Sequence, residues 1–279
     1  MNKILVTTDF SPNSRKGIHF AMQLAAQTNC ELIFYNVVEI FRPSIWDNVY
    51  YAQFETDELN RSKKILEQFI HAIYQKSTIQ KTPYKCVCQV GISASNQIIE
   101  YAKEINANYI CVSTIGTGKL IQLFGTTASE LVNFCPIPIF IVPRNYRSKP
   151  ITNVCFASDL VNIDEELNRV KQFTTSLKAK INILHFDYLV RLKDRKSKLN
   201  KLMTTYETDD VQFHFNELDA LYPLNDHIQR YVLKTKPSLL ISFTKQNRNW
   251  FNRLFLASKT ADMAYDTKTP MLVFRKRAK

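Results

Sequence analysis

The 279-residue chain has only 5 glycines and 10 prolines. No apolar run approaches the roughly 18 residues that a membrane-spanning helix requires, and the first residues lead into a strand-like segment instead of a signal peptide. We therefore expect a cytoplasmic protein with no membrane partner. Because 45% of the residues are hydrophobic, the chain can bury a substantial core, and its length favours two domains.

The cysteines and histidines form none of the common metal or redox motifs. The six cysteines include no C-x-x-C pair, and the five histidines form no H-x-H or H-E-x-x-H cluster, so we expect no metal site. Cys86 and Cys88 alternate within YKCVCQV and should point to the same face of a sheet. We interpret the cysteines as reduced core thiols, with a metal or redox role as the alternative.

Positive charge is in excess, with a formal net charge of +12 that favours anionic partners. Part of it comes from RLKDRKSKLNK, Arg191 to Lys201, in which Leu192 and Leu199 are separated by two helical turns. The segment is either a solvated helix face or a nucleic-acid patch. No aromatic residue is interleaved and no recognised binding motif accompanies it, which favours the solvated helix and no specific nucleic acid.

Strand-like and helix-like segments alternate through the first half of the chain. Apolar residues at 18, 21, 24 and 25, for example, form the stripe of an amphipathic helix. The alternation predicts an α/β fold with a doubly wound parallel sheet of five strands. The predicted strands are 3–8, 31–38, 85–90, 108–114 and 137–143, and the predicted helices are 13–27, 55–76 after an aromatic-rich loop, 95–105, and one beginning near Thr126.

The same pattern starts again after the polar segment RNYRSKPIT. ITNVCFASDL repeats NKILVTTDFS, with Asp159 in the place of Asp9, and TPMLVFRKR repeats IPIFIVPRN. This self-similarity predicts a tandem duplication with domains at 1–147 and 148–279. The last strand of each domain should lie at a sheet edge, where it either pairs the two domains as an intramolecular pseudo-dimer or packs in the core; a homodimer is also open.

The opening strand ends at a lone acid. In KILVTTDFSPNS, Asp9 directly follows the apolar residues and has no basic neighbour before Arg15. In one interpretation Asp9, Ser11 or Asn13 caps the following helix. In the other, Asp9 stands at the carboxyl end of a parallel strand, where open α/β sheets collect their ligands.

A second informative segment is STIGTGKLIQLFGTTASELV, residues 113–132. It follows a strand, leads into a helix and contains three of the five glycines. Glycine lets the backbone approach a ligand closely, and N–H groups at a helix N-terminus attract phosphate. The segment matches neither the Walker P-loop nor the G-x-G-x-x-G fingerprint. In the alternative interpretation, Gly116 and Gly118 form a turn and Gly125 allows tight packing.

Together these segments resemble the universal stress protein family in its tandem two-domain form. ILVTTDFSPNSRKGIHFAMQLA is similar to the family's opening strand, acid and helix. Family members that bind ATP carry the motif G-x-x-G, followed after nine residues by G-[ST]. In this chain, Ser113 to Gly116 take the place of G-x-x-G, eight residues follow, and Gly125 with Thr126 complete the motif before CPIPIFIVP. The resemblance is firm for 1–143 and loose for 151–275. It implies a Rossmann-like fold of the adenine nucleotide alpha hydrolase type.

The resemblance also implies ATP, alone or with Mg²⁺, in the first domain. Asp9 would face the nucleoside end and the backbone of Val37 would meet the adenine edge, while the ribose and phosphates would be held by Gly116, Gly125, Thr126 and Thr127. Two departures stand out: Ser113 replaces the first glycine of the pattern, and the loop is one residue short. Gly118 and Lys119 either compensate for these departures, or Lys119 simply faces solvent.

The second domain departs further from the family pattern. Its corresponding segment, SFTKQNRNWFNRLFLASKTAD, has no glycine, although Asp159 and Ser258 are retained. Larger side chains there would fill the space of a phosphate chain, and Trp250 with Phe251 suggest packing or a partner surface. We therefore predict no nucleotide in this domain and a structural or protein-binding role. The residues at the glycine positions of the pattern are Thr244, Asn247 and Ala257.

The predicted function is that of an ATP- or adenylate-binding regulatory protein of the stress response, acting on a protein partner that the sequence does not identify. The alternative is a scaffold or interaction module without nucleotide. We do not expect an enzyme, because H-x-G-H, S-G-G-x-D-S and G-x-S-x-G segments and a pair of acids for general acid and base work are all missing. Slow incidental ATP hydrolysis is compatible with this prediction.

Overall fold

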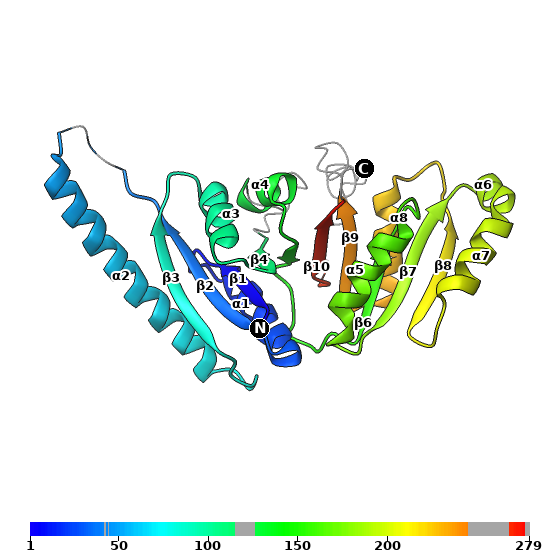
Figure 1. The fold of residues 1–279 in the computed structure, drawn as a ribbon, viewed down its shortest axis with the longest axis horizontal. Coiled ribbons are helices and arrows are strands. Elements are labelled where there is room, and N and C mark those ends of the chain that lie inside the picture. The colour runs from blue at the N-terminus through cyan, green and yellow to red at the C-terminus, as the bar shows by residue number, and fades with distance from the viewer. Residues whose placement is uncertain (42, 44, 115–125, 245–267, 277–279) are drawn as a thin grey trace. The chain divides into compact units, whose positions relative to one another are not determined.

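The computed structural model describes residues 1–41, 43, 45–114, 126–244 and 268–276. The described chain divides into two compact units (Figure 1). Unit 1 comprises residues up to 114 together with 126–144, and unit 2 comprises 145–244 and 268–276.

Unit 1 is a parallel sheet with the strand order β3-β2-β1-β4-β5. The chain moves outward from β1 to β3 and then returns to the other side of β1 with β4, so the strand order reverses between β1 and β4. Ligands of open α/β sheets bind at such a reversal. The elements are β1 (Lys3–Thr7), α1 (Ser14–Thr28), β2 (Glu31–Val38), α2 (Asn48–Gln75), β3 (Tyr84–Val90), α3 (Ala94–Glu104), β4 (Tyr109–Ser113), α4 (Thr126–Phe134) and β5 (Ile139–Val142).

Unit 2 repeats this arrangement with the strand order β10-β9-β6-β7-β8, again with parallel pairs. The predicted doubly wound α/β fold with five parallel strands in each half is confirmed. The elements are β6 (Asn153–Ala157), α5 (Ile163–Thr175), β7 (Lys180–Asp187), α6 (Leu189–Asp194), α7 (Lys196–Tyr206), β8 (Val211–Glu217), α8 (Leu224–Thr235), β9 (Leu239–Thr244) and β10 (Met271–Arg275).

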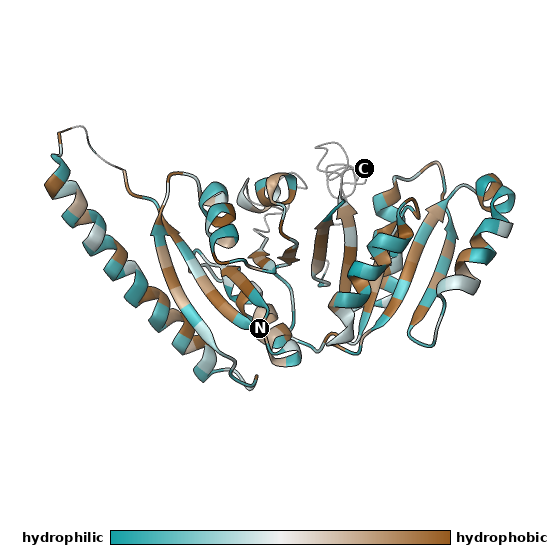
Figure 2. Cartoon of the chain, viewed as in Figure 1, coloured by the Kyte–Doolittle hydropathy of each residue, from teal (hydrophilic) through white to brown (hydrophobic). Residues whose placement is uncertain are grey.

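The core of each unit lies along the strands of its sheet, which Figure 2 shows as more apolar than the helices. Ile4, Leu5 and Val6 of β1 are completely buried, as are Val154 and Phe156 of β6. A continuous apolar run is typical of a parallel strand covered on both faces. Among the described helices, none combines the length and the hydropathy needed to cross a membrane.

Helix α2 differs from its predicted bounds. It begins at Asn48 instead of residue 55, and so takes in part of the segment that we predicted as an aromatic-rich loop. Asp47 is the cause, because its Oδ1 accepts a hydrogen bond of 2.7 Å from the Tyr50 N–H. This side chain satisfies a backbone donor that the first turn of a helix leaves without a partner.

Two smaller predictions also change. The basic segment Arg191 to Lys201 does not form one helix but runs through α6 and the start of α7, with a break at Arg195. Cys86 and Cys88 are half-buried and not core residues, because β3 is the outermost strand of unit 1. Burial still raises the pKa of the Cys86 thiol to about 12 and that of Cys88 to about 11, so both are protonated at neutral pH.

Candidate functional site

The turn after β1 directs the chain from the sheet into α1. Phe10 has φ of 63°, a left-handed conformation that costs a residue with a side chain about 1 to 2 kcal/mol. Its N–H donates to Thr8 Oγ1 at 3.0 Å, and its ring packs edge-on against Phe69 with centroids 5.6 Å apart. These contacts hold the turn in place and leave the neighbouring Asp9 exposed at the strand end.

The structure separates the two interpretations of Asp9, as a cap of helix α1 or as an acid at a ligand site. Asp9 Oδ1 accepts a hydrogen bond of 3.0 Å from the Ser11 N–H, which stabilises the turn ahead of α1. The helix end itself is served by Ser11 Oγ, which accepts from the Ser14 N–H at 3.2 Å, whereas the Asn13 side chain makes no cap hydrogen bond. The Asp9 carboxylate is therefore not the helix cap, and it also lines a cavity.

Buried polar groups fix the floor of that cavity. Thr8 and Ser14 share a hydroxyl–hydroxyl hydrogen bond of 2.9 Å, and Asn36 Nδ2 donates to the Thr8 carbonyl oxygen at 2.8 Å. All three side chains are at least nine-tenths buried. Because buried polar groups are costly without partners, these bonds lock the ends of β1 and β2 and the start of α1 into one arrangement.

The cavity has a volume of about 280 Å³ and lies at the carboxyl ends of β1, β2 and β4. Four of the residues that we predicted for a ligand site line it together, although they are widely spaced in the sequence. Val37 lies two residues beyond Tyr35, the last β2 residue paired with β1. The four are Asp9, Val37, Ser113 and Thr127.

Ser113, the serine in place of the family's first glycine, points toward α1. Its Oγ accepts a hydrogen bond of 3.0 Å from the Gly17 N–H. A Cβ at position 17 would collide with this oxygen, so the bare Gly17 backbone makes room for the serine. Gly17 was not among the predicted site residues, since its only signal was a glycine inside a helical pattern, where glycine often marks close packing.

Thr127 is held in place through helix α4. The Ser95 hydroxyl on α3 donates a hydrogen bond to the Glu130 carboxylate on α4, so the first turn of α4 stays beside the cavity. Thr126 is the first residue of α4, but its side chain is outside the described part of the structure. The other predicted residues of this segment, Gly116, Gly118, Lys119 and Gly125, lie outside the described residues.

The described wall of the cavity is acidic. Asp9 and Glu39 contribute carboxylates, and no lysine or arginine is present among the described lining residues. Burial raises the pKa of Tyr35, another lining residue, so its hydroxyl stays protonated and donates to Gln89 Oε1 at 2.8 Å. This wall suits hydroxyl and amino groups of a ligand and is unfavourable for its anionic groups.

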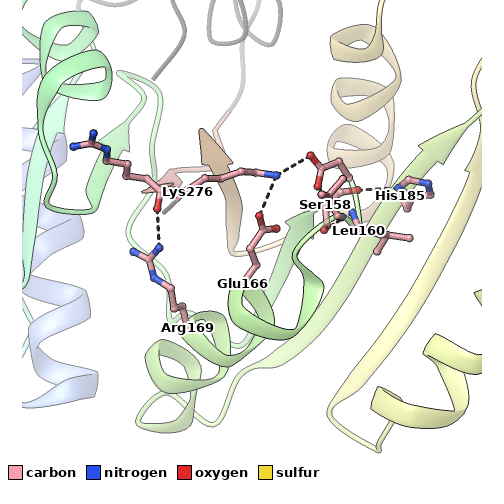
Figure 3. Close-up of polar contacts among 9 residues, drawn as sticks. Ser158, Leu160, Glu166, Arg169, His185 and Lys276 are labelled. Atoms are coloured by element: carbon pink, nitrogen blue, oxygen red, sulfur yellow. Dashed lines mark hydrogen bonds and ion pairs between the residues drawn. The ribbon is translucent and has the colours of Figure 1, made fainter. Parts of the chain in front are cut away.

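Unit 2 repeats three hydrogen bonds of this turn (Figure 3). Leu160 has φ of 61° and its N–H donates to Ser158 Oγ at 3.0 Å, as Phe10 does to Thr8. His185 Nδ1 lies 2.9 Å from the Ser158 carbonyl oxygen, as Asn36 does from that of Thr8. Asp159 Oδ1 accepts from the Val161 N–H at 3.0 Å, which matches the bond between Asp9 and Ser11.

The space beside Asp159 is filled differently from that beside Asp9. Lys276, just after β10, places Nζ 2.7 Å from Asp159 Oδ2 and 3.0 Å from Glu166 Oε1 (Figure 3). The side chains of Lys276 and Glu166 are only 8% and 4% exposed, whereas that of Asp159, at the rim, is 48% exposed. These three residues, which we call the buried ion triad, line a cavity of about 120 Å³, smaller than that of unit 1.

Burial and charge act against each other in the buried ion triad. Burial raises the pKa of Glu166, and the hydrogen bond and charge of Lys276 only partly offset it. Burial alone would lower the pKa of Lys276, but the hydrogen bonds and charges of Asp159 and Glu166 outweigh it, and the pKa is raised. The ammonium therefore stays charged at neutral pH and compensates the carboxylates.

Glu166 occupies the turn of α5 that corresponds to Gly17 in α1.

The chain matches the model of one protein family. The model of the Universal stress protein family matches residues 1–143. A universal stress protein from Archaeoglobus fulgidus DSM 4304 is 15% identical, with a TM-score of 0.66 and 99% of each chain covered. A putative universal stress protein from Pseudomonas aeruginosa UCBPP-PA14 is 16% identical, with a TM-score of 0.59 over 99% of this chain and 93% of that one. No curated protein shows significant similarity.

Proposed function

The chain belongs to the universal stress protein family, and from that premise we propose that unit 1 binds ATP or a related adenylate and that the bound state regulates a protein partner in the stress response. The observation that carries the proposal is the cavity at the carboxyl ends of β1, β2 and β4. It brings Asp9, Val37, Ser113 and Thr127 to one place, at the reversal of strand order where open α/β sheets bind ligands.

The charges of the cavity favour one orientation of the nucleotide. Phosphates beside Asp9 and Glu39 would meet carboxylates of the same sign, whereas ribose hydroxyls and the adenine amino group donate hydrogen bonds to carboxylates. The nucleoside end therefore belongs at Asp9 and Val37. The phosphates belong near the first turn of α4, where backbone N–H groups favour anions. A cavity of about 280 Å³ is small by the standard of ligand sites, ~300 to 1,000 Å³, and matches the nucleoside part.

Regulation follows only if the nucleotide binds two states of the protein with different affinity. The residues around the cavity are suited to binding rather than to turnover. We propose no catalytic group: Asp9 and Glu39 serve as hydrogen-bond acceptors, and slow ATP hydrolysis, with Mg²⁺ as companion of the phosphates, would be incidental. Phosphate release that is faster than the release of nucleotide would contradict this part of the proposal.

Isothermal titration with ATP in the presence of Mg²⁺ tests the proposal. We expect a single site, and we expect Asp9→Ala to weaken binding by about 1.5 to 3 kcal/mol, because a hydrogen bond to a charged group is lost. The matched control is Asp159→Ala, which removes the equivalent acid of unit 2 and should leave ATP affinity unchanged. No heat and no thermal shift with ATP, ADP, AMP or adenosine would overturn the proposal.

For unit 2 the buried ion triad favours a second function, that of a structural or protein-binding module. Lys276 already neutralises the acid that corresponds to Asp9, and the remaining cavity of about 120 Å³ is too small for a nucleoside. If the whole protein were such a scaffold, mass spectrometry of freshly purified, denatured protein would find no nucleotide, and titration would find no binding. Nucleotide recovered from wild type but not from Asp9→Ala would assign the site to unit 1.

A further inference from the structure

Strand β3 is the outermost strand of unit 1 and, among the described strands, pairs only with β2 (Figure 1). The Leu32 N–H of β2 donates to the Pro83 carbonyl oxygen, and the Gly91 N–H donates to that of Val38. Because the backbone groups of a strand face its two sides alternately, the odd-numbered residues of β3 bond to β2, and the even-numbered ones point their N–H and C=O groups away from it. These outward residues are Tyr84, Cys86, Cys88 and Val90.

The outermost strand of unit 2, β8, has an edge of the same kind but closes it with its own chain. There the odd-numbered residues point outward, since the Asp210 carbonyl oxygen accepts from β7. Val211 exchanges both of its backbone hydrogen bonds with Thr208, at 3.1 and 3.0 Å, and the Phe213 N–H donates to the Glu207 carboxylate at 3.0 Å. Within the described part of the chain, no such bond reaches the outward groups of β3, so its edge is open.

A groove of about 780 Å³ borders this open edge. Its β3 wall includes Tyr84 and Cys86, whose side chains lie on one face of the sheet, together with Lys85 and Val87, whose side chains lie on the other. The two faces of a strand meet along its edge, so the groove follows the backbone of β3. The second half of α2 supplies the other wall, with Lys63, Glu67, Gln68 and His71.

Helix α2 is fixed as a wall of this groove. Leu66, Ile70 and Ile73 are its buried residues, and the Tyr74 ring stacks on that of Tyr84 with centroids 5.0 Å apart. A wall that is already ordered loses little entropy when a ligand binds. An open edge strand beside a helix is also the arrangement in which several recognition domains take up an extended peptide as an additional strand.

The charges at the groove that have no partner are mostly positive. Lys63 lines the groove, and Lys81 lies 5.3 Å from the centre of the Tyr84 ring. Neither lysine forms an ion pair with a described residue, whereas Lys85 already forms one of 3.0 Å with a carboxylate on β2. Glu67 is the single acid of the described lining. The excess of positive charge favours acidic side chains in the occupant.

We propose that the groove between β3 and α2 receives an extended, acidic segment of a partner protein, which pairs with β3 as an additional strand. The outward backbone groups of β3 supply the affinity, because an extended polypeptide offers donors and acceptors at the matching spacing. Lys63 and Lys81 select acidic side chains. The inference gives a protein partner a place to dock, and it does not depend on nucleotide binding.

A second copy of this chain is a poorer occupant of the groove. Antiparallel pairing of two β3 edges about a two-fold axis puts both α2 helices on the same face of the joined sheet. The two edge strands would be about 4.8 Å apart, whereas the axes of packed helices are about 8 to 10 Å apart. Because α2 packs over β3 through the stack of Tyr74 on Tyr84, the two helices would collide. A separate extended segment brings no such helix.

Binding of a designed peptide to the full-length protein tests the proposal. The probe is a fluorescein-labelled peptide of about eight residues in which valine and glutamate alternate, since this length spans β3 and valine favours an extended strand. Fluorescence anisotropy should show saturable binding at one site. A peptide with lysine in place of glutamate should bind at least roughly tenfold more weakly.

Two N-methylated forms of the glutamate peptide test whether main-chain hydrogen bonds carry the binding. One form is methylated at the valines and the other at the glutamates. Only alternate N–H groups of a strand face its neighbour, so one of the two forms should lose binding and the other should keep it. Both forms have the side chains and the charge of the parent peptide.

Variants of the groove provide matched controls. Cys86→Pro removes an outward N–H, which an edge strand tolerates, and should weaken binding of the glutamate peptide by roughly tenfold or more. Cys86→Val keeps the N–H and should bind like wild type. Lys63→Glu should weaken the glutamate peptide and strengthen the lysine peptide, whereas Lys234→Glu, with the same net charge, should change neither. Circular dichroism of Cys86→Pro checks that the sheet is retained.

Three outcomes would overturn the proposal. If the glutamate peptide does not bind wild type at millimolar concentration, or binds no better than the lysine peptide, the groove does not select acidic extended segments. If both N-methylated peptides bind like the parent, or if folded Cys86→Pro binds like wild type, the contact is not a strand addition. If sedimentation velocity shows a wild-type dimer that Cys86→Pro abolishes, the edge of β3 belongs to a second copy.

Discussion

Lys276 Nζ lies 2.7 Å from Asp159 Oδ2 in unit 2. The equivalent acid of unit 1, Asp9, instead lines a cavity whose described wall contains no lysine or arginine. The two units thus share a strand-end acid and the turn that holds it, but only unit 2 compensates the acid with a cation of its own chain among the residues that the structure describes.

Removing the cation of the buried ion triad should strongly destabilise unit 2. In Lys276→Met, Glu166 remains 4% exposed without its partner, and an uncompensated buried charge costs about 3 to 5 kcal/mol. Urea unfolding followed by circular dichroism measures the loss. The double variant Lys276→Met with Glu166→Leu should recover most of it, and the exposed Lys234→Met is the matched control. Equal stabilities of Lys276→Met and Lys234→Met would disprove the role of the triad.

The contribution of Lys276 to the stability of unit 2 should be lost at alkaline pH. Burial alone would lower the pKa of Lys276, but Asp159 and Glu166 raise it above the ordinary 10.5. A raised folded-state pKa means that the ammonium contributes fully below about pH 10.5 and that the contribution disappears as the pH rises through the folded-state pKa. The difference in unfolding free energy between wild type and Lys276→Met should therefore shrink above that pH. A constant difference up to about pH 12 would contradict it.

In unit 1, the hydrogen bond between α1 and β4 depends on the absence of a side chain at position 17. Gly17→Ala would place a methyl carbon too close to Ser113 Oγ, so this hydroxyl must turn away and lose its hydrogen bond from the residue 17 N–H, at a cost of about 0.5 to 1.5 kcal/mol. Thermal unfolding of the two single variants and of Gly17→Ala with Ser113→Gly forms a double-mutant cycle. We expect the double variant to be more stable than Gly17→Ala, since the collision is removed. Additive effects would show that the two residues do not interact.

The polar floor of the unit 1 cavity gives a further expectation. Asn36 Nδ2 donates to the Thr8 carbonyl oxygen at 2.8 Å, so Asn36→Leu leaves a buried acceptor without that donor at a cost of about 1 to 3 kcal/mol. Because the bond fixes the strand ends beside Asp9, ATP affinity should fall as well. Asn36→His, which copies His185 of unit 2, should retain the bond and both properties. If Asn36→Leu kept the ATP affinity of wild type, the hydrogen bond between Asn36 and Thr8 would not be needed for nucleotide binding.

Much of the fold followed from local patterns. The strand at 31–38 was predicted with its observed bounds, and α1 and α3 were predicted to within one residue at each end, since a stripe or a run of apolar residues requires no knowledge of distant contacts. The start of α2 was predicted too late, because the aromatic residues Trp46, Tyr50 and Tyr51 obscured the cap that Asp47 provides. The position of Asp9 at a strand end was also readable, and its part in nucleotide binding stays a prediction.

The sequence by itself determined the alternation of strands and helices, the duplication and the placing of acids at the two strand ends, because hydropathy and turn residues act over a few neighbours. Only the tertiary structure decided which of the two acids has a cation beside it among the residues that the structure describes. The Gly17–Ser113 bond joins residues 96 apart, and the Lys276–Asp159 pair joins residues 117 apart. Such contacts depend on the order and register of strands in the folded sheet, which no local pattern encodes.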